Sequence, residues 1–198
     1  MNAKETAVLF IEFQNDFCHP DGKAYDGVKD ELARLGVVGN ARRLLNGARN
    51  AGCKIIHAPF TLDRKWIEEH QVTGILKGVY DGDVFAPGSW GHQIIDEMKP
   101  VDGEVVLEGK RATSAFSHTN LADILRFAKI KNLIVVGQLT NVCAQASAWS
   151  AYELGFNVRM IPEACASMSP AIHDYVLHQF CPVLGGALTV DEFLASLT

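Results

Sequence analysis

The sequence has no long apolar run. No stretch approaches the ~20 consecutive apolar residues that a membrane-spanning helix needs. The apolar residues near the start lead directly into Gln14-Asn15-Asp16, without the small-residue pattern of a cleaved signal peptide. We therefore expect no membrane association and a cytoplasmic location.

Positive charge and paired cysteines are also scarce. The 18 Lys and Arg residues are outnumbered by 23 Asp and Glu residues, which gives a net charge of −5, and no basic cluster occurs. This balance argues against a nucleic-acid partner. The five cysteines are an odd number and form no C-x-x-C pair, so we expect reduced thiols rather than disulfides or structural zinc.

The pattern that is present alternates between strands and helices. A chain of 198 residues, 48% hydrophobic and 21% charged, is typical of one folded domain, here residues 1–198. We predict a mostly parallel sheet of five or six strands with helices on both faces, an α/β fold. The predicted strands are residues 7–13, 53–59, 104–108, 133–136, 157–162 and 182–184. The predicted helices are residues 28–50, with a break near 36–39, and 92–98, 119–129, 144–154 and 170–180.

Residues 60–92 lack clear periodicity and are rich in aromatic residues and glycine. An irregular stretch of this length inside a compact domain is usually functional, so we predict a lid or pocket segment. The aromatic side chains could instead pack the subunit or an interface between subunits.

Cys143 lies where the predicted strand 133–136 turns into the helix 144–154. The N–H groups and positive dipole end of a helix stabilise an anion, and a thiol there can ionise near neutral pH. The sequence therefore offers Cys143 as a nucleophile. A cysteine in an apolar context can equally be a small core residue.

Two further reactive side chains follow predicted strands. Glu12 ends the strand 7–13, where a buried carboxylate needs a partner unless it reaches solvent at the sheet edge, and Lys110 comes just after the strand 104–108. Most lysines are solvated, so Lys110 alone says little. The carboxyl ends of parallel strands share one edge, however, so we expect Glu12, Lys110 and Cys143 to converge there.

These residues carry a resemblance to a known family. Glu12 to Phe17 (EFQNDF), Lys110 with Ser114-Ala115-Phe116, and Gly137-x-x-Thr140-Asn141-x-Cys143 occur in the order typical of the isochorismatase-like cysteine hydrolases. The resemblance covers nearly the whole chain. It implies a three-layer α/β/α sandwich with a doubly wound sheet, no cofactor, and a homo-oligomer, either a dimer or a tetramer.

The resemblance also implies roles for residues. Cys143 would be the nucleophile of a triad with Glu12 and Lys110, and Lys110 would polarise the site. The peptide bond Gln138–Leu139 would be cis, and the N–H groups of Leu139 and Cys143 would form the oxyanion hole. For the substrate pocket we predict Phe17, Trp66, Trp90, Phe116 and Thr140.

The chain departs from the family pattern in three places. Glu12 stands where the family has Asp, which retains a base but moves its carboxylate by roughly 1 Å. Glu163 stands where relatives often have Asp, and we expect it to affect the site at most indirectly. Nicotinamidases of this family bind a metal through Asp-x-His and a further His, whereas Asp63 is followed by Arg64 and Lys65.

Lys65 therefore puts a cation where the motif has a metal-binding histidine. For this reason we expect no metal and disfavour nicotinamide as the substrate. His70 is the one histidine beyond Asp63 in that segment, and the other six are read as structural or solvated: His19, His57, His92, His118, His173 and His178.

The sequence thus predicts a cysteine hydrolase that cleaves an amide or ureide-type C–N bond of a small molecule through a thioester. Two alternatives remain. Glu12 could mark a catalytically impaired binding protein, or the chain could hydrolyse a vinyl ether, as isochorismatases of the family do without needing the cysteine.

Overall fold

The fold is built on one five-stranded parallel sheet. The computed structural model describes residues 1–198, and the strands lie in the order β3-β2-β1-β4-β5. Each pair of neighbours is parallel, as predicted, so all five carboxyl ends lie at the same edge. The strands are β1 (Thr6–Ile11), β2 (Lys54–Ala58), β3 (Val105–Val106), β4 (Asn132–Gln138) and β5 (Asn157–Ala166).

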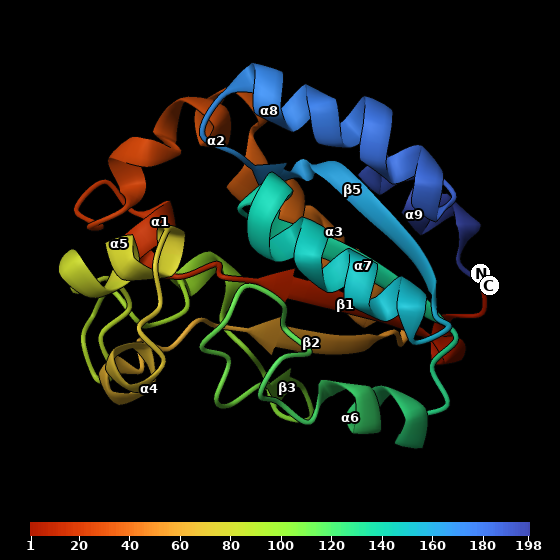
Figure 1. Ribbon diagram of the computed structural model, residues 1–198. Helices are drawn as coiled ribbons and strands as arrows, with labels where there is room; N and C mark the ends of the chain where they lie inside the picture. Colours follow the sequence, from red (N-terminus) through yellow and green to blue (C-terminus); the bar gives the residue numbers. More distant parts are fainter.

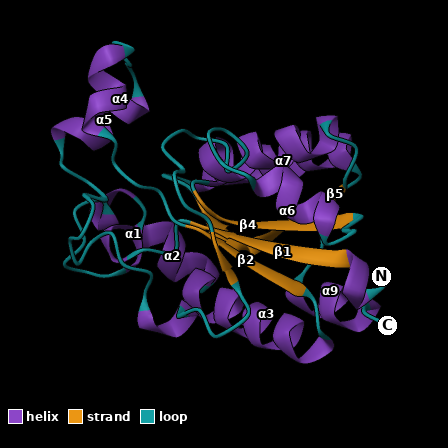
Figure 2. Ribbon diagram, turned by 90° about the horizontal axis from the view of Figure 1, so that it is seen from below, coloured by secondary structure: helices purple, strands orange, loops and turns teal.

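Helices cover both faces of this sheet, which confirms the three-layer α/β/α architecture. Figure 2 shows α6 and α7 on one face and α3 and α9 on the other. Figure 1 shows α1, α4 and α5 near the carboxyl ends of the strands, and both termini at the opposite end. The α-helices are α1 (Asn15–Cys18), α2 (Lys29–Leu35), α3 (Val37–Ala51), α4 (Arg64–Glu69), α5 (Ile75–Asp81), α6 (Leu121–Phe127), α7 (Gln145–Glu153), α8 (Pro170–Tyr175) and α9 (Val190–Ser196).

The central strands form the core because their side chains are apolar on both faces. All six residues of β1 are buried, and so are residues 133–138 of β4. Their hydrophobic residues, 7–11 and 133–136, belong to a cluster of 47 buried hydrophobic residues, while a separate cluster of three, Phe60, Val84 and Phe85, lies under α5. None of the helices is long and apolar enough to cross a membrane.

The predicted helix 28–50 is broken where glycine allows a left-handed backbone. Gly36 has φ 60° and ends α2, and α3 begins at the next residue. Gly52, with φ 81°, then ends α3. Both glycines satisfy carbonyl groups at a helix end in a conformation that other residues adopt only with strain.

Four predictions need correction. Residues 182–184 are not a strand: Cys181–Leu184 forms a 3₁₀-helix, since Pro182 cannot donate to a sheet and Gly185 at φ 102° turns the chain. β5 continues through Glu163 to Ala166, where we expected a loop. In the predicted helix 92–98 only the 3₁₀ turn Asp96–Met98 forms. Segment 60–92, expected to be irregular, contains α4 and α5.

Candidate active site

Glu12 and Lys110 form a buried ion pair at the carboxyl edge of the sheet. Glu12 follows β1 and Lys110 follows β3, and the Lys110 ammonium donates directly to the Glu12 carboxylate. The side chains are 0% (Lys110) and 3% (Glu12) exposed. Lys110 Nζ also donates to the carbonyl of Ala112 at 3.1 Å and lies 4.9 Å from the ring centre of Phe60. Carboxylate, carbonyl and aromatic face together compensate for the buried ammonium charge.

The backbone turns sharply at Glu12, and this turn aims its side chain. Glu12 has φ 57°, an uncommon left-handed conformation for a residue with a long side chain. Such a conformation costs of order 1 kcal/mol and persists where the surroundings hold it. Here the Glu12 N–H donates to Ala58 at 3.2 Å, and the Gln138 amide, oriented to satisfy its neighbours, donates to the carbonyls of Ile11 and Glu12.

Cys143 lies in the turn that links β4 to α7. The Gln138–Leu139 peptide bond is cis, and the π-helical turn Thr140–Ala144 follows and leads into α7. The hydroxyl of Ser147 donates to the Cys143 carbonyl at 2.6 Å and accepts from the Ala115 N–H at 2.9 Å. Ser147 therefore ties the Cys143 turn to the loop that follows Lys110.

The protonation of Cys143 differs from the sequence expectation. We predicted that the helix terminus would lower its pKa. Instead, burial and the neighbouring Glu12 carboxylate raise the pKa of Cys143 well above its ordinary value, although Lys110 and a hydrogen bond from the Leu139 backbone oppose them. Burial alone would lower the pKa of Lys110, but Cys143 and Glu12 raise it overall. The resting site is therefore a neutral thiol beside a carboxylate–ammonium pair.

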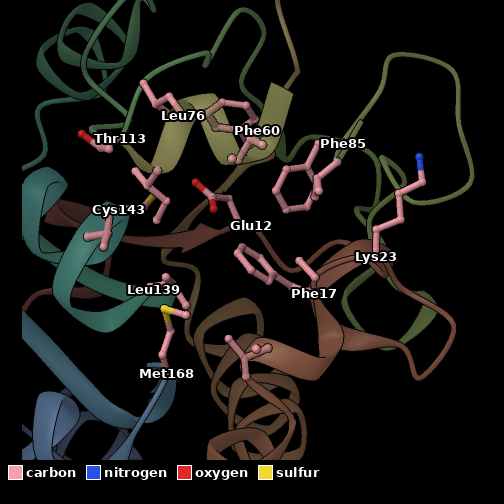
Figure 3. A pocket seen from close by; sticks show the side chains of 18 residues that line it. Glu12, Phe17, Lys23, Phe60, Leu76, Phe85, Thr113, Leu139, Cys143 and Met168 are labelled. Carbon is pink, nitrogen blue, oxygen red and sulfur yellow. The ribbon is translucent and has the colours of Figure 1, made fainter. Parts of the chain in front are cut away.

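A largely apolar cavity of about 390 Å³ opens onto Glu12 and Cys143. Figure 3 shows the rings of Phe17, Phe60 and Phe85 gathered around Glu12. The cavity has 18 lining residues, 13 of them hydrophobic. The remaining walls include Lys23 of the segment after α1, Ile75, Leu76 and Val79 of α5, Thr113 of the segment after Lys110, Leu139 and Val142 of the β4–α7 turn, and Met168, which follows β5.

Of the five residues predicted for the pocket, only Phe17 lines this cavity, and the other four lie elsewhere. Trp66 packs against His70 and His118. Trp90 is 45% exposed beside His19. Phe116 packs near Phe156, and Thr140 is buried against His173, with which its hydroxyl makes a 3.0 Å hydrogen bond. We predicted these pocket residues from their side-chain type, whereas the course of the loops decides which rings face the cavity.

Three polar residues that frame the pocket were not among the predicted site residues. Gln14 is fully buried. Its amide nitrogen donates to the Phe60 carbonyl at 2.9 Å, and its amide oxygen accepts from the Phe60 N–H at 2.8 Å. Asn15 donates to the Trp90 carbonyl at 2.8 Å. Asp16 accepts from the N–H of Phe85 at 2.6 Å. Polar residues directly after a buried strand were the available signal, since buried amides and carboxylates need partners.

The side chains at the position of the nicotinamidase metal motif are engaged elsewhere. Asp63 accepts from the Trp66 N–H at 2.9 Å and from Arg111 at 2.6 Å. His70 stacks on Trp66, and no three His, Cys, Asp or Glu side chains gather where they could hold a metal ion. Glu163 is remote from this chemistry: it accepts from the N–H of Val190 at 2.7 Å and so anchors α9.

Comparison with known proteins shows the family of this chain. The family model of the isochorismatase domain matches residues 6–192. The chain therefore belongs to the isochorismatase family of hydrolases.

Individual relatives match over nearly their full length. The ureidoacrylate amidohydrolase RutB of Rhizobium rhizogenes is 27% identical over 211 residues, which cover 100% of this chain and 85% of that protein. A cysteine hydrolase from Pseudomonas syringae pv. phaseolicola superposes with a TM-score of 0.85 at 24% identity, covering 98% of this chain and 93% of its own. N-carbamoylsarcosine amidase from Thermoplasma acidophilum gives a TM-score of 0.70 at 24% identity, covering 95% and 98%.

Proposed function

We propose that this protein hydrolyses a C–N bond of a small amide or ureide through a thioester on Cys143. The observation that carries the proposal is the buried Glu12–Lys110 pair beside Cys143 at the base of a cavity. The similarity to RutB, described as a ureidoacrylate amidohydrolase, supports the bond type.

In the proposed mechanism the thiol loses its proton only as it attacks. Ionising Cys143 alone would add a net negative charge to a buried site that already holds one carboxylate and one ammonium. Transfer of the thiol proton to Glu12 keeps the net charge constant, and Lys110 then faces the thiolate. The sulfur attacks the carbonyl carbon, and the N–H groups of Leu139 and Cys143 stabilise the oxyanion.

Glu12 then returns the proton to the departing nitrogen, so that ammonia or an amine leaves and the acyl group remains on sulfur. Glu12, ionised again, accepts a proton from water as the water attacks the thioester. Collapse of that intermediate releases the acid and restores the thiol. One carboxylate thus acts in turn as base, acid and base.

The contact between Glu12 and Lys110 supports an active site rather than an impaired one. Glu12 stands where the family resemblance leads us to expect Asp, and from its left-handed backbone its carboxylate still bonds the lysine. We infer that the substitution preserves the proton relay.

The test is ammonia release by the purified protein from a panel of small amides and N-carbamoyl compounds. We expect Cys143→Ala to lower the rate by about 10³-fold or more, since the nucleophile is lost, with little change in melting temperature. The control is Cys165→Ala, which also removes a buried thiol but from the interior of β5.

Ammonia release that survives Cys143→Ala would contradict the thioester route and favour vinyl-ether hydrolysis or another acid-catalysed reaction. Absence of turnover in the parent, with activity gained by Glu12→Asp, would identify an impaired relative.

We also propose a homo-oligomer formed through the outer face of α7 and the segment that follows β5. Trp149, Tyr152, Ile172 and Tyr175 are between 39% and 63% exposed, and such a concentration of large apolar side chains is typical of an interface. Light scattering after size-exclusion chromatography measures the mass directly.

A further inference from the structure

We propose that the pocket selects uncharged amides with an apolar tail, and that Asp83 maintains this selectivity by holding Lys23 away from the substrate. The inference rests on the proposed function and extends it to the class of substrate.

The walls of the cavity offer a substrate apolar surface rather than charge. Phe17 packs edge-on against Phe85 at 5.1 Å between ring centres, and Phe60 lies 5.7 Å from Phe85. Leu76 and Val79 of α5 pack against this same aromatic group. An apolar tail placed here is removed from water on several sides, which is the main source of affinity in such pockets.

Phe85 is held in this wall by its backbone. Its N–H donates to the buried Asp16 carboxylate, and its φ of 56° is left-handed. Asp16 lies against Gly91, where a Cβ would fall 2.2 Å from the carboxylate oxygen, so that no larger residue fits. The inward-facing ring is thus fixed before a ligand binds.

The cations near the cavity are already paired. Lys110 is bonded to Glu12, and Arg111 is bonded to Asp63. Lys23 is the only positively charged residue in the lining, and its ammonium donates to the carboxylate of Asp83 at 2.9 Å and to the Asp83 carbonyl at 2.7 Å. In the view of Figure 3 the rings of Phe17 and Phe85 lie between Lys23 and Glu12.

Asp83 has a second partner that fixes its position. Arg64 of α4 donates to its other carboxylate oxygen at 2.5 Å. Asp83 therefore joins the segment after α1 to α4 at the rim of the cavity, and its carboxylate holds the ammonium of Lys23 there. A carboxylate on a bound substrate would meet only cations that already donate to carboxylates of the protein, and it would share the cavity with the Glu12 carboxylate, which disfavours its burial.

The same electrostatics favour release of the product. Hydrolysis of a neutral amide, R–CO–NH₂ with water, gives R–COOH and ammonia, and the acid ionises to a carboxylate. That anion finds no unpaired cation in the lining, since Lys23 is bonded to Asp83, so its burial is not compensated. The site thus accepts the neutral substrate and expels the charged product.

The test uses two amides of the same shape, 6-methylheptanamide and adipamate, in which a carboxylate replaces the terminal isopropyl group. We expect kcat/KM for ammonia release to favour 6-methylheptanamide by about 10²-fold or more. Equal values, or a preference for adipamate, would overturn the proposal.

Binding of both compounds to Cys143→Ala, measured by calorimetry, separates this proposal from the proposed function. If the wild type releases no ammonia but the variant binds only the neutral amide, the hydrolytic function fails and the charge selectivity stands. If neither compound binds, or both bind equally, the selectivity is refuted whatever the turnover shows.

Asp83→Asn tests the role of the rim pair, since Asn fits the left-handed backbone at φ 49° but cannot neutralise Lys23. We expect the ratio of kcat/KM for 6-methylheptanamide to kcat/KM for adipamate to fall by about three- to tenfold, mainly through tighter binding of adipamate. Asp81→Asn is the matched control: it removes the same charge from α5, where Asp81 pairs with Lys77 outside the lining. An unchanged preference in Asp83→Asn, or an equal shift in Asp81→Asn, would refute the assignment to Asp83.

Discussion

At the scale of single residues, the active-site chemistry depends on where one proton resides. Burial and the Glu12 carboxylate raise the pKa of Cys143, and Lys110 lowers it. Below that raised pKa the sulfur stays protonated, so only a small fraction is thiolate at neutral pH. In the proposed mechanism the thiol therefore stays weakly reactive until a substrate accepts the developing charge.

This assignment predicts opposite effects of Glu12→Gln on two reactions. The variant should lose ammonia release, because no base takes the thiol proton. It should also alkylate faster at Cys143 with iodoacetamide at pH 7, because the pKa of Cys143 falls once the neighbouring negative charge is gone and Lys110 remains. Peptide mass spectrometry locates and times the label.

The other thiols serve as internal controls. Burial raises the pKa of Cys165 to about 12, and β4 separates its strand β5 from β1, which Glu12 follows, so its slow labelling should not change. Slower labelling of Cys143 in Glu12→Gln would contradict the assigned role of the carboxylate.

The sequence was sufficient to bring the three reactive residues together but not to describe their environment. Their convergence follows from topology, because parallel strands end at one edge. The direction of the Cys143 pKa shift was predicted wrongly, since the depth of burial and the approach of Glu12 arise only from tertiary packing. For the same reason the rings of Phe60 and Phe85 could not be distinguished from those of Trp66 and Trp90.

At the scale of elements, Glu104 secures the short edge strand β3. Its carboxylate accepts two hydrogen bonds from Arg49 of α3, at 2.6 and 2.9 Å, and lies 2.9 Å from His57 of β2. It also accepts from the Val101 N–H at 3.1 Å. Burial alone would raise the pKa of Glu104, but the bonds from Arg49 and His57 lower it to about 2.

We expect Glu104→Gln to lower the free energy of unfolding at pH 7 by up to about 3 kcal/mol. Because the folded pKa lies below the ordinary value, ionised Glu104 contributes its full stability above about pH 4.5. That contribution is lost as the pH falls toward 2. Urea unfolding at several pH values should show that the difference in the free energy of unfolding between wild type and variant shrinks below pH 4.5.

Glu108→Gln is the matched control, since Glu108 is exposed just beyond the other end of β3. Its effect should stay within about 0.5 kcal/mol at every pH. A Glu104→Gln difference that is independent of pH would contradict the assigned pKa.

Two elements were missed for different reasons. β5 extends past Pro162 and Glu163 because its end pairs with β4, with Gly137 opposite Cys165 and Gln138 opposite Ala166. The short helix α9, by contrast, has a signal in the sequence, since Val190, Phe193, Leu194 and Leu197 recur at the spacing of one helix face. A capping box between Thr189 and Glu192 begins it, and the bond from Val190 to Glu163 anchors it to β5.

At the scale of the whole molecule, the sheet and the pocket cover differ in how firmly they are packed. The core of 47 residues joins the sheet to its flanking helices. The cover over the cavity depends on Phe60, Val84 and Phe85, and no residue of α5 is fully buried. We propose that residues 60–92 act as a lid whose moving part is α5, because a helix without a buried residue opens at a lower cost in free energy than the core does.

Native-state hydrogen exchange tests this division. Backbone amides of α5 should exchange at least about 100-fold faster than those of β4, because local opening exposes them without unfolding of the sheet. Saturating the Cys143→Ala variant with 6-methylheptanamide should slow exchange in α5, since Leu76 and Val79 line the cavity and the ligand adds apolar contact there. Amides of α9, which lies outside the lining, should not respond. If α5 were as protected as β4 in the free protein, the cover would be part of the rigid scaffold, and ligands would have to enter without its opening.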